Sequence, residues 1–254
     1  MTRHNGGAAH LRQQADLYQF LLPISFHRGW TLQQRLHQDR VEGRRRDALL
    51  LLQHEPVYTI GRRTSPAHLP GGEIELLRKG ATVEYVSRGG SITFHGPGQL
   101  VGYPIFLLSD YAPGPRKYVW LLEETVIRTL SLWDIPAYRI HRQPGVFVRG
   151  SEGDAKIASI GIRVERGVTL HGFSLNLDLD LGWFSCIIPC GLSGCGTASI
   201  ASLSAMPVSF SNVAHQVSGI FGQLFGLSWT VQVETNDIAT GPGPCPAPVF
   251  TEDL

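Results

Sequence analysis

Lysine, methionine and cysteine are scarce in this chain of 254 residues, and long apolar runs are missing altogether. The only lysines are Lys79, Lys117 and Lys156 among 22 basic residues. No apolar run approaches the roughly 18 residues that a transmembrane helix requires. The first 16 residues are polar and basic, unlike the apolar stretch of a secretory signal peptide. We therefore expect a globular, cytoplasmic protein without a membrane-spanning segment.

The four cysteines all lie in the last third of the chain, at Cys186, Cys190, Cys195 and Cys245. A framework of disulfides would spread its cysteines more evenly, so the pattern favours free thiols in a reducing compartment. Three of them could suggest zinc, but their spacing is not the usual paired one, and His171 or Cys245 would have to supply the fourth ligand. We expect no metal and no disulfide.

Charge is distributed unevenly although the formal net charge is only +1. Residues 1–166 hold all 22 basic residues and 15 acidic ones, a balance of +7, and residues 167–254 hold six acidic residues and no lysine or arginine, a balance of −6. The basic part could steer an acidic protein partner or be an ordinary arginine-rich surface. Basic residues do not interleave with aromatic ones, so nucleic acid is not an expected partner.

Hydrophobic periodicity predicts strands interspersed with a few helices, which is typical of a mixed α/β (α+β) protein. We expect a disordered lead-in over residues 1–16, a single catalytic domain over 17–235 and a tail rich in proline and glycine over 236–254. The expected helices are 30–41, 117–133 and 210–225. The expected strands are 18–25, 48–53, 57–60, 82–86, 100–108, 145–148, 156–164, 168–177 and 229–233.

Residues 88–99, Arg-Gly-Gly-Ser-Ile-Thr-Phe-His-Gly-Pro-Gly-Gln, depart most from ordinary globular sequence. Glycines let the backbone approach a ligand closely and expose its N–H groups, so the block could cradle an anion or an acyl carbonyl. It could equally be a tight connection between strands, with His95 as a hydrogen-bonded structural residue. The block lacks the Gly-Lys-Ser/Thr of a phosphate-binding loop and the glycine spacing of a dinucleotide fingerprint.

Two further segments carry groups capable of chemistry. Lys156 begins an apolar strand, where it could extend its amine to water or hold a desolvated amine that acts as an acid or base. Cys190 lies between Pro189 and Gly191, which would hold the thiol on a rigid bend. An inert, buried cysteine is the alternative for that position.

Taken together, four segments resemble, in their order and spacing, the lipoyl(octanoyl) transferases of lipoate biosynthesis. They are residues 88–99, 156–163, 171–176 and 189–191, and the resemblance covers roughly residues 17–230. It implies the fold of the biotin/lipoate protein ligase catalytic domain, with a central mixed sheet flanked by helices. The arginine-glycine block and the spacing of 34 residues between Lys156 and Cys190 are its most specific features.

The resemblance implies that an octanoyl group passes from octanoyl-acyl carrier protein to Cys190 as a thioester. From there it passes to a lysine on the lipoyl domains of 2-oxoacid dehydrogenase E2 subunits or of the glycine cleavage H protein. Lys156 would lower the pKa of the Cys190 thiol and act as acid and base. No cofactor, nucleic acid or membrane is implied. The alternatives are an ATP-dependent lipoate or octanoate ligase and a catalytically silent protein that binds the same partners.

The same resemblance implies which residues line the acyl pocket. They are Arg88, Gly89, Gly90, Ser91, Ile92, Thr93, Phe94, His95, Ser159, Ile160, Gly161, Gly172, Phe173 and Ser174. Among these, Ile92, Phe94, Ile160 and Phe173 are the expected apolar walls.

Overall fold

The computed structural model describes residues 13–151, 153–188 and 194–234. A nine-stranded sheet runs through it in the order β12-β1-β2-β6-β10-β9-β8-β7, and the short β11 pairs with β9. Strand β1 is parallel to both of its neighbours, and the strands from β2 to β7 in that order are antiparallel. A second sheet has the order β4-β3-β5. The mixed α/β class with a central mixed sheet is confirmed.

The elements have the following bounds. The strands are β1 (Gln13–Phe20), β2 (Ala48–Leu52), β3 (Val57–Ile60), β4 (Thr82–Tyr85), β5 (Thr93–His95), β6 (Gln99–Ile105), β7 (Ala137–Ile140), β8 (Gln143–Gly150), β9 (Gly153–Glu165), β10 (Val168–Asn176), β11 (Gly196–Thr197) and β12 (Leu227–Glu234). The α-helices are α1 (Phe26–Val41), α2 (Gly72–Arg78), α3 (Pro115–Ser131), α4 (Ile200–Leu203) and α5 (Phe210–Phe225), and the 3₁₀ turns are η1 (Pro66–His68), η2 (Leu108–Asp110) and η3 (Leu181–Cys186).

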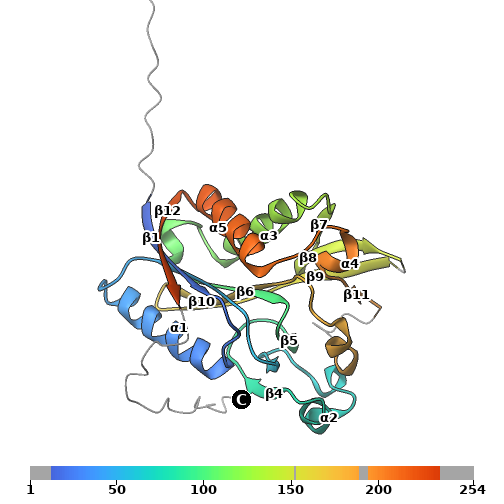
Figure 1. Cartoon of the computed structure of the whole chain (residues 1–254). Coiled ribbons are helices and arrows are strands. Elements are labelled where there is room, and N and C mark those ends of the chain that lie inside the picture. The colour runs from blue at the N-terminus through green and yellow to red at the C-terminus, as the bar shows by residue number, and fades with distance from the viewer. Residues whose placement is uncertain (1–12, 152, 189–193, 235–254) are drawn as a thin grey trace, which may run out of the picture.

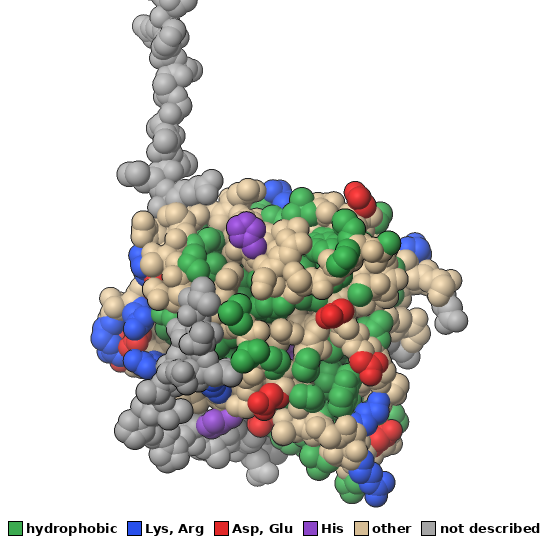
Figure 2. All heavy atoms as spheres, viewed as in Figure 1, with side chains coloured by type: hydrophobic (Ala, Val, Ile, Leu, Met, Phe, Trp, Pro, Cys, Tyr) green, Lys and Arg blue, Asp and Glu red, His purple; other side chains and the backbone are tan. Residues whose placement is uncertain are grey.

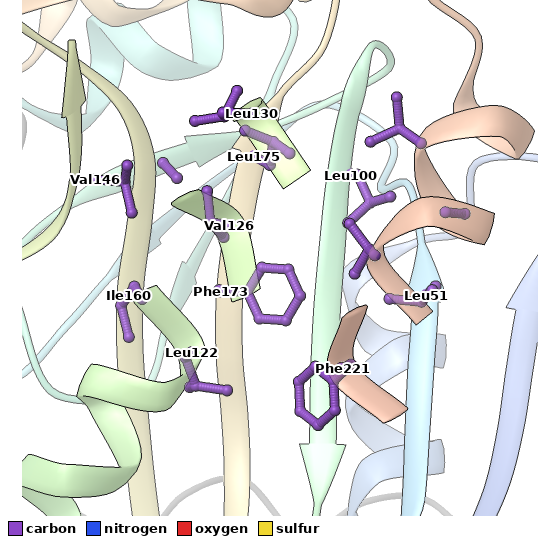
Figure 3. Packing of buried hydrophobic residues seen from close by; sticks show 14 of the residues in the cluster. Leu51, Leu100, Leu122, Val126, Leu130, Val146, Ile160, Phe173, Leu175 and Phe221 are labelled. Atoms are coloured by element: carbon purple, nitrogen blue, oxygen red, sulfur yellow. The ribbon is translucent and has the colours of Figure 1, made fainter. Parts of the chain in front are cut away.

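Helices cover the large sheet on both faces. Figure 1 shows α3 and α5 above the sheet, and α1 and the small sheet below it. Between the sheet and the upper helices lies the largest apolar cluster, to which Leu122 and Val126 of α3 and Phe221 of α5 contribute. Figure 3 shows Ile160 and Phe173 of the sheet pointing toward these helix residues. A separate apolar cluster fills the space between the sheet and α1.

Local signals explain where the helices begin and end. The predicted helix over 210–225 is confirmed as α5, since Ser209 caps its first turn and Gly226 ends it in the left-handed conformation. Helix α1 begins at Phe26, four residues before the predicted start, because the hydroxyl of Ser25 accepts from the N–H of Arg28 and caps the helix there.

Several predicted boundaries were wrong. Strand β1 begins at Gln13 and pairs with both β2 and β12, so residues 13–16 are sheet and do not belong to the expected lead-in. It ends at Phe20, before the predicted limit at residue 25. Helix α2 and strands β5 and β7 were not predicted, because each is short and carries little hydrophobic periodicity.

In the part of the chain that the structure describes, no helix is long and apolar enough to cross a bilayer.

Glycines allow the paired strands β6 and β10 to pack tightly against each other. A Cβ on Gly172 would lie 2.1 Å from the carbonyl oxygen of Gly102 and 2.6 Å from Cδ of Pro104. A Cβ on Gly102 would meet the ring of Phe173 at 2.3 Å. These positions therefore admit no larger residue without displacing backbone or a buried ring.

We predict that Gly172→Ala lowers the free energy of unfolding by about 1–3 kcal/mol, the usual cost of forcing extra atoms into a packed core. Urea denaturation followed by circular dichroism measures it. The matched control is Gly219→Ala on the exposed face of α5, where a Cβ meets nothing within 4 Å and alanine raises helix stability by up to about 1 kcal/mol. Equal effects of the two substitutions would contradict this view of the sheet.

Candidate active site

Arg88 organises the backbone of the glycine-rich block. Its guanidinium donates to the carbonyl oxygens of Ser91 (2.7 Å), Gly89 (3.1 Å) and Thr59 (2.7 Å). Gly90, between the first two, has a φ of +89°, which favours glycine. The hydrogen bonds of the Arg88 guanidinium thus fix the conformation of the segment that joins strand β4 to strand β5.

A chain of buried polar groups runs from this block into the large sheet. The hydroxyl of Thr59 donates to Nε2 of His95 (3.4 Å), and Nδ1–H of His95 donates to Oε1 of Gln99 (2.7 Å). The amide of Gln99 donates to Oδ1 of Asn176 (2.9 Å), and the amide of Asn176 donates to the carbonyl of Ala198 (2.9 Å). His95 therefore supports the site by hydrogen bonding, as its structural interpretation predicted.

A narrow cavity of about 40 Å³ lies beside this chain. Its floor is formed where β9 and β10 pair, with Ser159 opposite Ser174 and Gly161 opposite Gly172. Because these residues are small, they leave space between the large sheet and the small sheet that larger side chains would fill. The complete lining is Phe26, Thr59, Val86, Arg88, Gly90, Thr93, His95, Val101, Tyr103, Ser159, Ile160, Gly161, His171, Gly172, Phe173 and Ser174.

The structure brings most of the expected pocket residues together and places four of them elsewhere. Ile92 and Phe94 pack with Tyr58 in the core of the small sheet. Neither Gly89 nor Ser91 lines the narrow cavity. The expected walls Ile92 and Phe94 therefore do not face it, because both side chains are taken up by the small sheet's own core.

Ile160 and Phe173 touch the cavity, but their side chains belong to the cluster beneath α3 and α5 (Figure 3). Sequence reasoning missed three apolar residues that line the cavity where Ile92 and Phe94 were expected. They are Phe26, Val86 and Val101. They come from the start of α1, the residue after β4 and the middle of β6, and only folding brings them together.

A second cavity of about 230 Å³ adjoins the first, since Gly90 and Ile160 line both. Lys156 lines this larger cavity. Its other lining residues are Arg63, His68, Gly90, Ser91, Arg142, Gln143, Pro144 and Ile160. Ser91, expected in the acyl pocket, is found here, with its hydroxyl 2.6 Å from Nδ1 of His68.

Lys156 has an almost fully buried side chain, with 5% of its surface exposed. Its ammonium donates to the carbonyl oxygen of Pro144 at 3.0 Å and lies 5.4 Å from the centre of the Phe147 ring. It does not extend into solvent, so the interpretation of Lys156 as a strand-edge residue reaching for water is wrong.

A β-bulge decides which face of the sheet Lys156 occupies. Along β9 the register shifts by one residue against Val146 and Phe147 of β8, and Ile157 is the additional residue. Strict alternation would put Lys156 on the opposite face from Ser159 and Gly161. The bulge reverses that alternation, so the lysine and the small-residue floor share one face of the sheet.

Two positioning residues were missed from the sequence. A Cβ on Gly145, whose φ is +135°, would lie 2.5 Å from Cε and 3.0 Å from Nζ of Lys156, so only glycine leaves room for the amine. Glu123 of α3 is buried, accepts from the N–H of Gly145 (3.0 Å) and pairs with Arg139 (3.0 Å). A glycine at the start of the predicted strand 145–148 was the only sequence signal for this arrangement.

Cys190, the expected nucleophile, lies outside the described residues. The described residues on either side of 189–193 do contact the wall of the larger cavity. The N–H of Ile188 donates to the carbonyl of His68 (3.0 Å), and Thr197 of β11 pairs with Lys156. Ile188 and Thr197 thus each contact a residue that lines the larger cavity.

The arginine-rich segment near the end of α1 is neutralised by acidic neighbours. Arg44 pairs with Asp39 (2.7 Å) and Arg46 with Asp16 (2.7 Å). Arg40 pairs with Asp47, the residue just before β2 (2.6 Å). Figure 2 shows blue and red side chains mixed at the left edge of the molecule, where α1 ends.

Among the residues that the structure describes, no three metal-binding side chains form a cluster.

Comparison with known proteins gives a consistent set of similarities. Residues 25–222 match the family model described as the lipoyl protein ligase A/B catalytic domain. A relative named octanoyltransferase from Caldicellulosiruptor saccharolyticus is 44% identical over 209 residues, covering 82% of this chain and 87% of the relative. Another of that name, from Chloroflexus aggregans, is 40% identical over 205 residues and covers 80% and 92%.

Among solved structures, a bipartite lipoate protein ligase from Thermoplasma acidophilum, described together with its E2 lipoyl domain, superposes with a TM-score of 0.65. The match covers 88% of both chains at 14% identity, so it shows a shared fold. The fold that the sequence resemblance implied is thus confirmed, and so is the resemblance itself.

Three buried histidines near the narrow cavity make the fold sensitive to acid. Burial lowers the pKa of His54 to about 4, and the pKa values of His95 and His171 to about 3, below the ordinary value of 6.5. In the unfolded chain these side chains bind protons below about pH 6.5, whereas in the folded chain they stay neutral. Stability is therefore lost as the pH falls through this window.

We predict a loss of about 1.4 kcal/mol of unfolding free energy per histidine for each pH unit between about 6 and 4. Urea denaturation at pH 7, 6 and 5 measures the slope. His95→Gln should make the slope shallower by about one such increment, whereas the exposed control His215→Gln should keep the wild-type slope. An unchanged slope in His95→Gln would show that His95 takes up its proton in the folded state as well.

Proposed function

This chain belongs to the lipoyl protein ligase A/B catalytic domain family, and we propose that it is an octanoyltransferase that acts in protein lipoylation. Relatives about 40% identical over most of the chain bear that name. The observation that carries the proposal is a buried lysine amine held beside a cavity, whose lining residues His68 and Lys156 are contacted by Ile188 and Thr197 on the two sides of the Cys190 segment.

The proposed donor is octanoyl-acyl carrier protein, and the proposed acceptor is the lysine of a lipoyl domain on a 2-oxoacid dehydrogenase E2 subunit or on glycine cleavage H protein. The structural neighbour from Thermoplasma acidophilum is described with its E2 lipoyl domain, which supports an acceptor of that kind. Both partners and the scarcity of cysteine support a cytoplasmic location.

In the first proposed step, the thiolate of Cys190 attacks the carbonyl carbon of the octanoyl thioester. An ammonium beside a thiol stabilises the thiolate, and Lys156 is the cation of the described site that would do this. The bond between the carbonyl carbon and the donor sulfur breaks, and Lys156 gives a proton to the departing thiolate, which leaves as a thiol. The octanoyl group then rests on Cys190 as a thioester, and Lys156 is neutral.

In the second step, the neutral amine of Lys156 accepts a proton from the attacking lysine amine of the acceptor. An amide bond forms, the bond to the Cys190 sulfur breaks, and the thiolate and ammonium are restored. The carbonyl of Pro144 at 3.0 Å orients the amine of Lys156 through both steps. The reaction needs no ATP, because the donor thioester and the Cys190 thioester differ little in free energy, and the amide product is more stable than either.

The narrow cavity over the Ser159, Gly161, Gly172 and Ser174 floor is the proposed site of the octanoyl chain. Its side walls include the apolar residues Phe26, Val86 and Val101. Six methylenes at about 0.8 kcal/mol each would contribute roughly 5 kcal/mol if fully buried.

We predict that incubation with octanoyl-acyl carrier protein adds one octanoyl group to the intact protein, measured by mass spectrometry. Cys190→Ser should abolish this adduct and transfer, since a hydroxyl is a poor nucleophile at neutral pH. Lys156→Met should lower the acylation rate by at least about a hundredfold, the usual range for a lost acid–base group. Cys195→Ser is the matched control, and full acylation of Cys190→Ser would overturn the mechanism.

A ligase would behave differently in the same assay. Wild-type protein given ATP and free octanoate, without carrier protein, should leave the acceptor domain unmodified. Modification under these conditions would favour the ATP-dependent alternative, and no modification from either donor would favour a silent binding protein.

Gly145→Ala tests whether the position of the amine matters as well as its presence. The new methyl group would displace Cε and Nζ of Lys156, so we predict a fall in the acylation rate of at least about tenfold, as expected when a catalytic group is misplaced by about 1 Å. Gly153→Ala is the control, because its φ is also positive but its Cβ meets nothing within 4 Å. Equal rates in the two variants would remove Gly145 from the positioning of Lys156.

A further inference from the structure

The larger cavity is lined by positive charge. Arg63, Arg142 and Lys156 contribute to it, and no aspartate or glutamate is among its described lining residues. The reaction proposed above accounts for Lys156, but it assigns nothing to the two arginines. A recess lined by cationic side chains and by no described acidic residue is suited to an anionic ligand.

Both arginines are attached to backbone that belongs to the site. The N–H of Arg63 donates to the carbonyl of Gly90 (3.1 Å), within the turn that Arg88 holds. Arg142 lies in the two-residue turn between β7 and β8 with a φ of +62°, an unusual conformation for a residue other than glycine. It precedes Pro144, whose carbonyl binds the Lys156 amine, by two residues, a span of at most about 7 Å.

Neither guanidinium forms a hydrogen bond or ion pair with any side chain across residues 13–151, 153–188 and 194–234. Other described arginines do find acidic partners, as Arg139 does with Glu123 at 3.0 Å and Arg149 with Asp154 at 2.9 Å. Both Arg63 and Arg142 are exposed, so a ligand entering the cavity reaches them before it reaches the buried amine.

We propose that Arg63 and Arg142 bind the phosphodiester of a 4′-phosphopantetheine arm, the group that carries the acyl thioester to Lys156. This inference rests on the proposed function and deepens it by naming how the donor is recognised. A phosphodiester keeps its negative charge at any physiological pH, and the planar guanidinium of arginine matches its oxygens. A slender arm also fits a recess, whereas the flat acidic face of a protein does not.

The arm could be presented by a carrier protein, where its 4′-phosphate is a phosphodiester, or by coenzyme A, where the same phosphate is part of a diphosphate; both carry negative charge at physiological pH. In either case the thioester would lie at the lysine end of the cavity and the phosphate at its arginine-lined mouth. Because the interaction is charge-assisted and partly exposed, its strength should fall as the salt concentration rises.

A binding experiment tests the proposal without requiring turnover. The probes are S-octyl-4′-phosphopantetheine and S-octylpantetheine, two thioethers that cannot be transferred and that differ only in the phosphate. Isothermal titration calorimetry should show that the wild-type protein binds the phosphorylated probe at least about tenfold more tightly. Arg63→Gln and Arg142→Gln should each reduce that ratio severalfold, and the double variant should bring it close to one.

Arg116→Gln, an exposed substitution at the start of α3, is the matched control and should keep the wild-type ratio. A ratio near one in the wild-type protein, or equal weakening of both probes in the two variants, would overturn the proposal. If the probes bind as expected but no octanoyl group is ever transferred, the proposed function fails and the phosphate site stands.

A kinetic comparison then separates the two sources of the arm. If Arg63→Gln and Arg142→Gln lower kcat/KM for octanoyl-coenzyme A and for octanoyl-acyl carrier protein by similar factors, both donors use the site through the 4′-phosphate that their arms share. A loss with the carrier protein alone, while the probe ratio is unaffected, would assign the arginines to the protein surface and refute the phosphate site.

Discussion

One bulge in strand β9 determines how the site is built. Alternation along a strand would place Lys156 on the side of the sheet that faces α3, together with Ala158 and Ile160. The additional residue at Ile157 reverses the alternation, so Lys156 shares a face with Ser159 and Gly161. A buried amine then lies in line with a floor of small side chains, and the apolar residues of the same strand remain free to pack beneath the helices.

The cost of burying this amine is met by a set of groups from neighbouring elements. The Pro144 carbonyl accepts its hydrogen bond, the Phe147 ring lies nearby, and Gly145 leaves space for its last carbon. Glu123 of α3 holds the N–H of Gly145, and Arg139 in turn neutralises Glu123. An unsatisfied buried charge is costly, so each of these contacts helps to keep the lysine in the folded interior.

The glycine-rich block contributes mainly by organising the backbone. Arg88 binds carbonyl oxygens of the turn, and His95 passes hydrogen bonds from Thr59 to Gln99. Through Asn176 the same chain of hydrogen bonds reaches the carbonyl of Ala198, just after β11. The segments on either side of the narrow cavity are therefore linked by a network of buried hydrogen bonds. Breaking one of these bonds would reduce the stability of the fold by more than the strength of that single bond, because the bonds in a buried network strengthen one another.

The sequence by itself determined the family resemblance, the fold class and the long, strongly periodic helices, because these depend on local motifs and on hydrophobic spacing. Helix 210–225, with a serine before it and a glycine after it, needed no tertiary information. Lys156 could also be singled out from the sequence, since it is one of three lysines and begins a predicted apolar strand.

The tertiary structure alone decided which way the side chains face. Ile92 and Phe94 looked like pocket walls, but the small sheet has its own core and takes them up. Phe26, Val86 and Val101 form the walls instead, from segments far apart in the chain. A bulge depends on the pairing of two strands, and a cavity depends on where distant elements pack, so neither leaves a signal in local sequence.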